Sequence, residues 1–176
     1  MATVIRGDDN FDTAATLRGI QLGTMVATTS GTSIDFTGIP AGVRRVTLSL
    51  IGVSTNASTV HLIQIGDSGG VETSGYLGGS RNSASQGNYT QAFGTAGASD
   101  STPAVAVQHG TMTLTLVNAS TFTWVSTWQG FRSNEAVTLD GAGSKSLSAV
   151  LDRIRLTTVS GSATFDAGSV NITWEF

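Results

Sequence analysis

Ser68 lies in the segment Gly66-Asp67-Ser68-Gly69-Gly70, whose residue types are those that surround a nucleophilic serine. In serine hydrolases such glycines leave backbone amides free to form an oxyanion hole, and a histidine and a buried aspartate activate the hydroxyl. The context does not support this chemistry, because Val71 stands where protease segments of this kind have proline, and His61 is the one histidine that precedes Ser68. Asp-Ser-Gly-Gly also suits the end of a β-hairpin, where glycine adopts a positive φ. We therefore interpret the segment as a turn and predict a protein without catalytic residues or enzymatic activity.

Metal-binding residues are also sparse. Asp8, Asn10 and Asp12 are spaced like the first ligands of a calcium loop, but the glycine and glutamate that such a loop needs at its sixth and twelfth positions are Thr13 and Gly19 here. His61 and His109 are the two histidines, and a metal site would need two or three histidines or carboxylates on neighbouring strands. The chain has no cysteine. We expect no metal and no cofactor, and we expect the histidines to stack or to form hydrogen bonds.

The tryptophans and phenylalanines alternate along two segments. Phe122, Trp124 and Trp128 share one strand face, and Trp174 shares another with Phe176. Exposed rings on a sheet could stack on sugars, but a chain with three Trp and seven Phe needs its aromatic residues for packing. We therefore place these five residues in the core or in a seam between subunits.

A second group of aromatic residues lies in a long segment with few other large apolar residues. Residues 67–103 are rich in Gly, Ser, Ala and Asn, and a loop of this length is usually functional or disordered. Loops carry binding residues while sheets support them. Tyr76, Tyr89 and Phe93 are therefore our candidates for a loop that contacts a receptor.

Four arginines form two doublets, at Arg44 and Arg45 and at Arg153 and Arg155. Nucleic-acid binding would require a net basic surface, whereas this chain has a net charge of −3 and an isoelectric point of about 5.1. We expect no nucleic acid as partner. Salt bridges to acidic residues of a neighbouring subunit are the better interpretation of the doublets.

The composition indicates an all-β protein. Of the 176 residues, 69 are Ser, Thr or Gly, while charged residues make up 12%. Apolar and hydroxyl residues alternate with period two, as in Val46–Ile51 and Thr111–Leu116, which is typical of half-buried antiparallel strands. Asp140–Gly143 has the composition of a turn. We expect eight strands in a jelly-roll-like antiparallel β-sandwich, over residues 24–28, 33–36, 43–53, 59–65, 110–118, 121–129, 145–159 (with a break near Asp152) and 169–176.

The chain divides into an arm and a domain. Residues 1–22 are predicted to form a short N-terminal docking arm, in which Phe11, Leu17 and Ile20 are the apolar candidates for contact. Residues 23–176 are predicted to form the β-sandwich, with the Gly/Ser-rich loop tract at 67–103 inside it. The polar start lacks a secretion signal, and no stretch is long and apolar enough to insert in a membrane.

Three segments resemble a known family: residues 31–40 with 44–47, residues 64–73, and residues 151–159 with 165–172. Their central motifs are Thr32-Ser33-Ile34-Asp35-Phe36, Ile65-Gly66-Asp67-Ser68-Gly69 and Asp152-Arg153-Ile154-Arg155-Leu156. Together they resemble a C-terminal module of tail-fibre-like and other small virion proteins of tailed bacteriophages. The resemblance implies a virion component that is homotrimeric or arrayed by symmetry and has no enzymatic activity. It transfers no binding residues.

Two functions remain open at this point. The first is a structural protein of tail-fibre or attachment type, assembled in the host cytoplasm, which docks by its arm onto other virion proteins and presents loops to a host glycan or protein. The alternative is a head decoration or cement protein that stabilises a capsid lattice. Close subunit packing suits both, because Ser and Thr lose little side-chain entropy on burial and need no charge partner.

Overall fold

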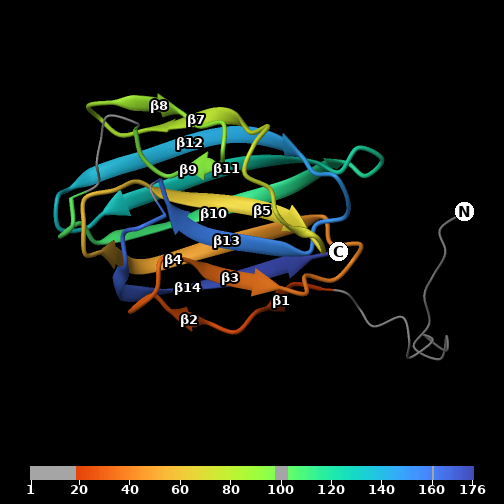
Figure 1. The fold of residues 1–176 in the computed structure, drawn as a ribbon, viewed down its shortest axis with the longest axis horizontal. Helices are drawn as coiled ribbons and strands as arrows, with labels where there is room; N and C mark the ends of the chain where they lie inside the picture. Colours follow the sequence, from red (N-terminus) through yellow and green to blue (C-terminus); the bar gives the residue numbers. More distant parts are fainter. Residues whose placement is uncertain (1–18, 98–102, 160) are drawn as a thin grey trace, which may run out of the picture.

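The structure is a computed structural model that describes residues 19–97, 103–159 and 161–176. These residues form strands and loops without any helix, and the strands lie in two facing antiparallel sheets (Figure 1). The strands are β1 (Gln21–Leu22), β2 (Val26–Ala27), β3 (Ile34–Thr37), β4 (Arg45–Thr55), β5 (His61–Asp67), β6 (Gly70–Val71), β7 (Leu77–Arg81), β8 (Gln86–Asn88), β9 (Phe93–Gly94), β10 (Gln108–Asn118), β11 (Thr123–Arg132), β12 (Val137–Ser146), β13 (Arg153–Thr158) and β14 (Phe165–Glu175).

The larger sheet has nine strands in the order β1-β14-β4-β10-β11-β12-β7-β8, with β2 also paired to β14. The smaller sheet has five strands in the order β3-β13-β5-β6, with β9 also paired to β5. The chain passes repeatedly between the two sheets, as from β3 to β4 and from β4 to β5, while the consecutive strands β10, β11 and β12 are neighbours in the larger sheet. The predicted jelly-roll-like antiparallel β-sandwich is confirmed.

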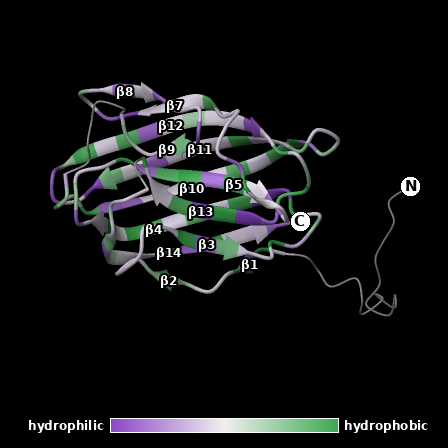
Figure 2. Ribbon diagram, in the orientation of Figure 1, coloured by the Kyte–Doolittle hydropathy of each residue, from purple (hydrophilic) through white to green (hydrophobic). Residues whose placement is uncertain are grey.

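Alternating side chains build the core between the sheets. In β4, Val46, Leu48 and Leu50 are buried while Arg45 is exposed, and in β10 Met112 and Leu114 are buried while Thr111 and Thr115 are exposed. Figure 2 shows the resulting alternation of apolar and polar bands along the strands. The hydroxyl residues of the period-two segments thus face outward, as the sequence predicts, because a strand turns successive side chains to opposite faces.

A glycine pair lies at an irregularity in the pairing of β4 with β14. The register between β4 and β14 shifts on both sides of Ala167, next to Gly168, which has φ +92°. A Cβ at Gly168 would lie 2.4 Å from the carbonyl carbon of Gly52, whose φ is +65°. This close approach of two backbones at a β-bulge requires glycine.

The prediction of a loop tract over 67–103 is wrong for the described part of that segment. Four short strands, β6 to β9, lie in it, and β7 and β8 extend the larger sheet. The turn predicted at Asp140–Gly143 is also wrong: these residues lie inside β12, which pairs with β11 on one side and with β7 on the other. Glycine is compatible with a strand where another backbone packs closely, and a Cβ at Gly143 would lie 2.8 Å from the carbonyl oxygen of Leu77.

One predicted strand corresponds to two strands of the structure, and one predicted turn is found. The predicted strand 145–159 is the end of β12 and the separate strand β13, and residues 147–152 between them confirm the break predicted near Asp152. The hairpin turn at Gly66–Gly70 is confirmed, since β5 and β6 pair through Asp67 and Gly70 and the Gly69 amide donates to Asp67 Oδ1 at 2.7 Å.

The start of the sandwich overlaps the predicted arm. Gln21 and Leu22 form β1 and pair with Trp174 and Thr173 of β14. Ile20 is 69% exposed, whereas Phe11 and Leu17 lie outside the described residues. Within the described ranges, no helix is long and apolar enough to cross a membrane.

Candidate functional site

A hollow of about 920 Å³ lies on the face of the larger sheet that points away from the smaller sheet, over β10, β11, β12, β7 and β8. The strand register explains its lining. Two rows of outward side chains cross these five strands at right angles to the chain. The first row is Thr113, Thr127, Ala142, Gly79 and Asn88, and the second row is Thr111, Gln129, Asp140, Arg81 and Gln86.

The smallest residues of the first row form the floor of the hollow. Ala142 and Gly79 are cross-strand partners, and larger side chains flank them on both sides. Gly79 cannot carry a side chain without rearrangement, because a Cβ there would lie 2.5 Å from the carbonyl oxygen of Gly87 in β8. Small residues on the central strands therefore form a floor, and Thr, Asn and Gln side chains form the walls.

An ion pair stands in the second row. Arg81 Nε lies 3.0 Å from each carboxylate oxygen of Asp140, and the two side chains are 65% and 46% exposed. An exposed pair of this kind contributes between zero and about 1 kcal/mol to stability. Its effect on the hollow is chemical: it places a planar donor beside an acceptor and leaves the pair with no net charge.

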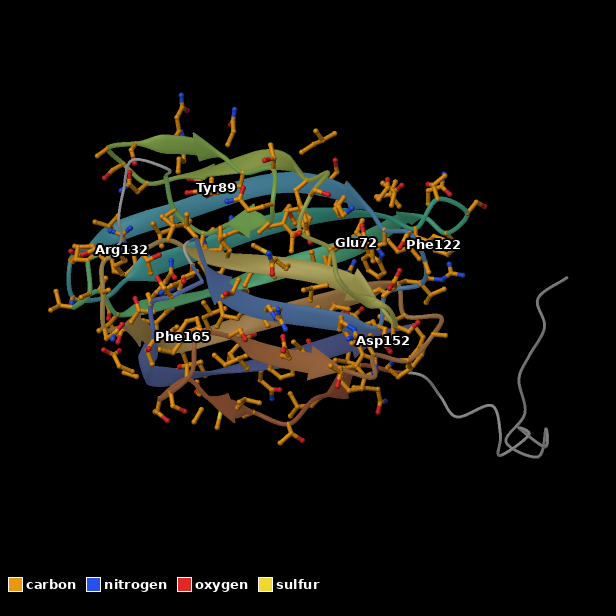
Figure 3. All side chains as sticks on the ribbon, viewed as in Figure 1. Glu72, Tyr89, Phe122, Arg132, Asp152 and Phe165 are labelled. Carbon is orange, nitrogen blue, oxygen red and sulfur yellow. The ribbon has the colours of Figure 1, made fainter. Side chains whose placement is uncertain are left out.

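The residues predicted to contact a receptor are not at this surface. Tyr76, Tyr89 and Phe93 are 1%, 5% and 5% exposed, so the prediction that they contact a receptor is wrong for the folded domain. Tyr76 accepts from the Ile65 amide at 2.8 Å and packs edge-on against Phe93, with ring centroids 4.9 Å apart. Tyr89 donates to the Ala96 carbonyl at 2.8 Å (Figure 3). These rings hold the segment between β6 and β9 against the sandwich.

The tryptophans of β11 lie in the core, as predicted. Trp124 and Trp128 are 2% and 1% exposed, and Trp128 Nε1 donates to the Thr95 carbonyl at 3.0 Å. Trp174 and Phe176 are partly buried and pack against the same core. Trp124 and Trp128 are therefore closed to solvent, so stacking on a sugar does not involve them.

The arginine doublets pair within the chain. Arg155 Nε lies 2.6 Å from Asp35 Oδ1, Arg45 Nη1 lies 3.3 Å from Glu175, and Arg153 Nη2 lies 2.9 Å from Asp152. The partner of each is a carboxylate on a neighbouring strand or the adjacent residue. These three arginines therefore have carboxylate partners within one chain, and salt bridges to a neighbouring subunit stay a prediction.

His61 is fully buried between the sheets. Its Nδ1 forms a hydrogen bond with Gln108 Oε1, and its ring centroid lies 5.7 Å from that of Phe165. Burial is the main cause that lowers the pKa of His61 to about 4, and the charge of Arg132 acts in the same direction. His109 instead accepts from the Gly52 amide through Nδ1 at 3.2 Å. Both histidines thus form hydrogen bonds, as predicted.

Ser68 has no activating histidine. It follows the end of β5, whereas His61 begins that strand and is sealed in the core. Six residue-to-residue steps along the extended strand place Asp67 roughly 20 Å from His61. The Ser68 carbonyl accepts from Arg153 Nη2 at 3.0 Å, which is a turn contact. Across the ranges that the structure describes, no three His, Cys, Asp or Glu side chains are grouped to hold a metal.

A second cluster of charged groups joins β6, β12 and the segment before β13. Lys145 is 7% exposed and forms an ion pair with Glu72, and Lys145 Nζ also lies 5.5 Å from the ring centroid of Tyr76. The Ser148 amide donates to Glu72 Oε1 at 2.7 Å. Burial raises the pKa of Glu72, but the ion pair and the bonds from Ser148 outweigh it, so the pKa lies below its usual value. This cluster fastens loops and offers no opening for a ligand.

Comparisons with protein-family models, with curated proteins and with solved structures gave no significant match to this chain. Its function is therefore argued from the residues, the fold and the hollow.

Proposed function

We propose that this chain is a structural protein of the tail-fibre or attachment type in a tailed bacteriophage virion. In this proposal residues 1–22 dock onto other virion proteins, the sandwich forms a homotrimer, and the hollow on the larger sheet contacts the host surface. The three sequence segments that resemble virion proteins support the virion part. The proposed contact with the host is made by the hollow and not by Tyr76, Tyr89 and Phe93, because these three side chains are buried.

The hollow is the observation that favours attachment. Attachment requires a surface that is both rigid and open to a ligand, because a preorganised site loses little entropy on binding. Four strands of the hollow, β10, β11, β12 and β7, are each paired on both sides. Backbone hydrogen bonds therefore hold the outward groups of these strands at fixed spacings. These groups line the hollow, whose volume is about 920 Å³ and which is open to solvent.

The β1–β2 edge of the larger sheet supports assembly. Ile20, Leu22 and Met25 are 69%, 73% and 60% exposed there, next to the predicted arm. Exposed apolar residues grouped at an edge indicate contact with another protein surface. The same observation favours the alternative of a head decoration protein, which would fasten this edge onto a capsid lattice.

Location on the particle separates the two functions. Antibody against the purified chain, used for immunogold electron microscopy of particles that carry it, should label tails or baseplates. Labelling spread over heads would favour the decoration protein, and unlabelled particles would contradict both proposals.

Docking and trimer formation are tested on purified protein. Deletion of residues 1–19 leaves β1 in place and should abolish incorporation into particles, while tryptophan fluorescence and circular dichroism report an intact sandwich. Light scattering should give a trimer for the full chain at micromolar concentration. Incorporation of the truncated chain would show that residues 1–19 are not the anchor, and a monomer would exclude the trimer.

A further inference from the structure

The polar groups of the hollow are available to a ligand. Gln86, Asn88 and Gln129 form no side-chain hydrogen bond with any other residue in the described part of the chain. Each amide offers donors and an acceptor, and the threonine hydroxyls of the neighbouring strands offer the same. Hydrogen bonds of both kinds, spread over several strands, suit a ligand that carries many hydroxyl groups.

The charge of the hollow restricts the class of ligand. Its one guanidinium, on Arg81, is compensated by the carboxylate of Asp140, which Nε approaches at 3.0 Å on both oxygens. A ligand rich in phosphate, sulfate or carboxylate would need unpaired cations, which this lining lacks. The balance of charge therefore favours an uncharged ligand.

The lining also argues against a peptide ligand. Peptides bind through an open strand edge or through apolar pockets that hold anchor residues. Four of the five strands of the hollow have both edges paired, and β8, which pairs with β7 alone, has three residues. Ala142 is the only exposed apolar side chain among the lining residues. The hollow has the volume of a generous small-ligand site, for which about 300–1,000 Å³ is usual, but it is open along the sheet. A chain of sugar units fits such an open trough.

We propose that the hollow binds an uncharged polysaccharide. One sugar hydroxyl donates a hydrogen bond to the carboxylate of Asp140, and the adjacent hydroxyl of the same sugar accepts one from Arg81. The ion pair therefore binds two adjacent hydroxyls. The sugar ring lies over the floor of Ala142 and Gly79, and Gln129, Gln86 and Asn88 bind further hydroxyls. This inference deepens the proposed attachment function and rests on it only for the biological source of the ligand.

The lining of the hollow predicts the affinity and the salt dependence of glycan binding. Because each contact is a neutral or charge-balanced hydrogen bond of modest net strength, a single hollow binds weakly. Several hollows on one assembly then raise the overall affinity by acting together on one polymer. Binding should also change little with ionic strength, since no net charge is neutralised.

The test uses the full chain on an array of bacterial and plant glycans that contains uncharged and acidic members. Ala142→Phe fills the floor from an exposed position without removing any polar group. Thr138→Phe is the matched control, because Thr138 lies on the same strand and the same outward face but does not line the hollow. Arg81→Met removes the donor of the ion pair.

The wild type should bind at least one uncharged glycan, with an affinity that changes less than threefold between 50 and 500 mM NaCl. Ala142→Phe and Arg81→Met should weaken that binding tenfold or more, whereas Thr138→Phe should leave it unchanged. Failure to bind any uncharged glycan, binding restricted to acidic glycans, or full binding by Ala142→Phe would each overturn the proposal. Immunogold labelling is independent of this result, so a failure here leaves the virion role standing, and unlabelled particles leave glycan binding standing.

Discussion

Acidification should destabilise the fold through His61 before the carboxylates contribute. The side chain is fully buried, and its pKa lies at about 4 instead of the ordinary 6.5. The unfolded chain therefore binds a proton more readily than the folded chain between these two values. The stabilising effect of the neutral ring is fully present above pH 6.5 and is lost as the pH falls toward 4.

The size of this loss follows from the difference between the two pKa values. One pKa unit corresponds to about 1.4 kcal/mol, so the free energy of unfolding should fall by about 2 kcal/mol between pH 7 and pH 5, and by about 3 kcal/mol at pH 4. Asp67 and Glu72 have pKa values below their ordinary 3.8 and 4.5. Their contributions are lost mainly below pH 5, so the interval from pH 7 to 5 isolates the histidine.

Urea denaturation followed by tryptophan fluorescence measures the effect at each pH. His61→Gln should be less stable than the wild type at pH 7, but its free energy of unfolding should change by less than about 0.5 kcal/mol between pH 7 and 5. His109→Gln removes the other histidine and should retain the loss that the wild type shows. An equal loss in the wild type and in His61→Gln would refute the reasoning, because the acid sensitivity would then arise elsewhere.

Three further substitutions test what holds the sandwich together, each by urea denaturation at pH 7. Gly168→Ala should cost more than about 1 kcal/mol, because it places a Cβ against Gly52 at a positive φ; an unchanged midpoint would show that the bulge relaxes freely. Lys145→Met should cost about 2 kcal/mol or more by leaving the half-buried Glu72 without its cation, and a smaller cost would mean that Ser148 satisfies this carboxylate alone. Arg155→Met removes an exposed pair and should cost less than about 1 kcal/mol, so a larger loss would reveal a role beyond the ion pair.

The period-two segments predicted the fold well because both of their faces carry a signal. Val46–Ile51 and Thr111–Leu116 alternate between core and hydroxyl residues, and both lie in long central strands of the larger sheet. The composition was equally informative, because Thr and Val favour strands and the scarcity of charge excludes helical bundles.

Strands without that alternation escaped prediction. Leu77–Arg81 and the middle of β12 are rich in glycine. From sequence alone a glycine-rich segment is assigned to a turn, because the neighbouring backbones that pack closely against it are not known. The same ambiguity hid the candidate site. Tyr89 and Phe93 looked exposed because their segment looked like a loop, whereas the strands β7 to β9 bury them.

The hollow itself could not be read from the sequence. Its ten outward residues come from five strands, and only the register places Asp140 beside both Gln129 and Arg81. One signal was present: Thr111, Thr113 and Thr127 alternate with buried residues, which marks an outward polar face. Which strands lie beside that face depends on tertiary pairing.

Competition for the host surface tests the central claim most directly, that the hollow on the larger sheet is where this protein contacts the host. Purified wild-type chain and Thr138→Phe should bind cells of the bacterium on which the particles grow, and they should reduce the adsorption of those particles, whereas Ala142→Phe should do neither. Equal competition by Ala142→Phe and the wild type, or no competition by the wild type at saturating concentration, would contradict the account.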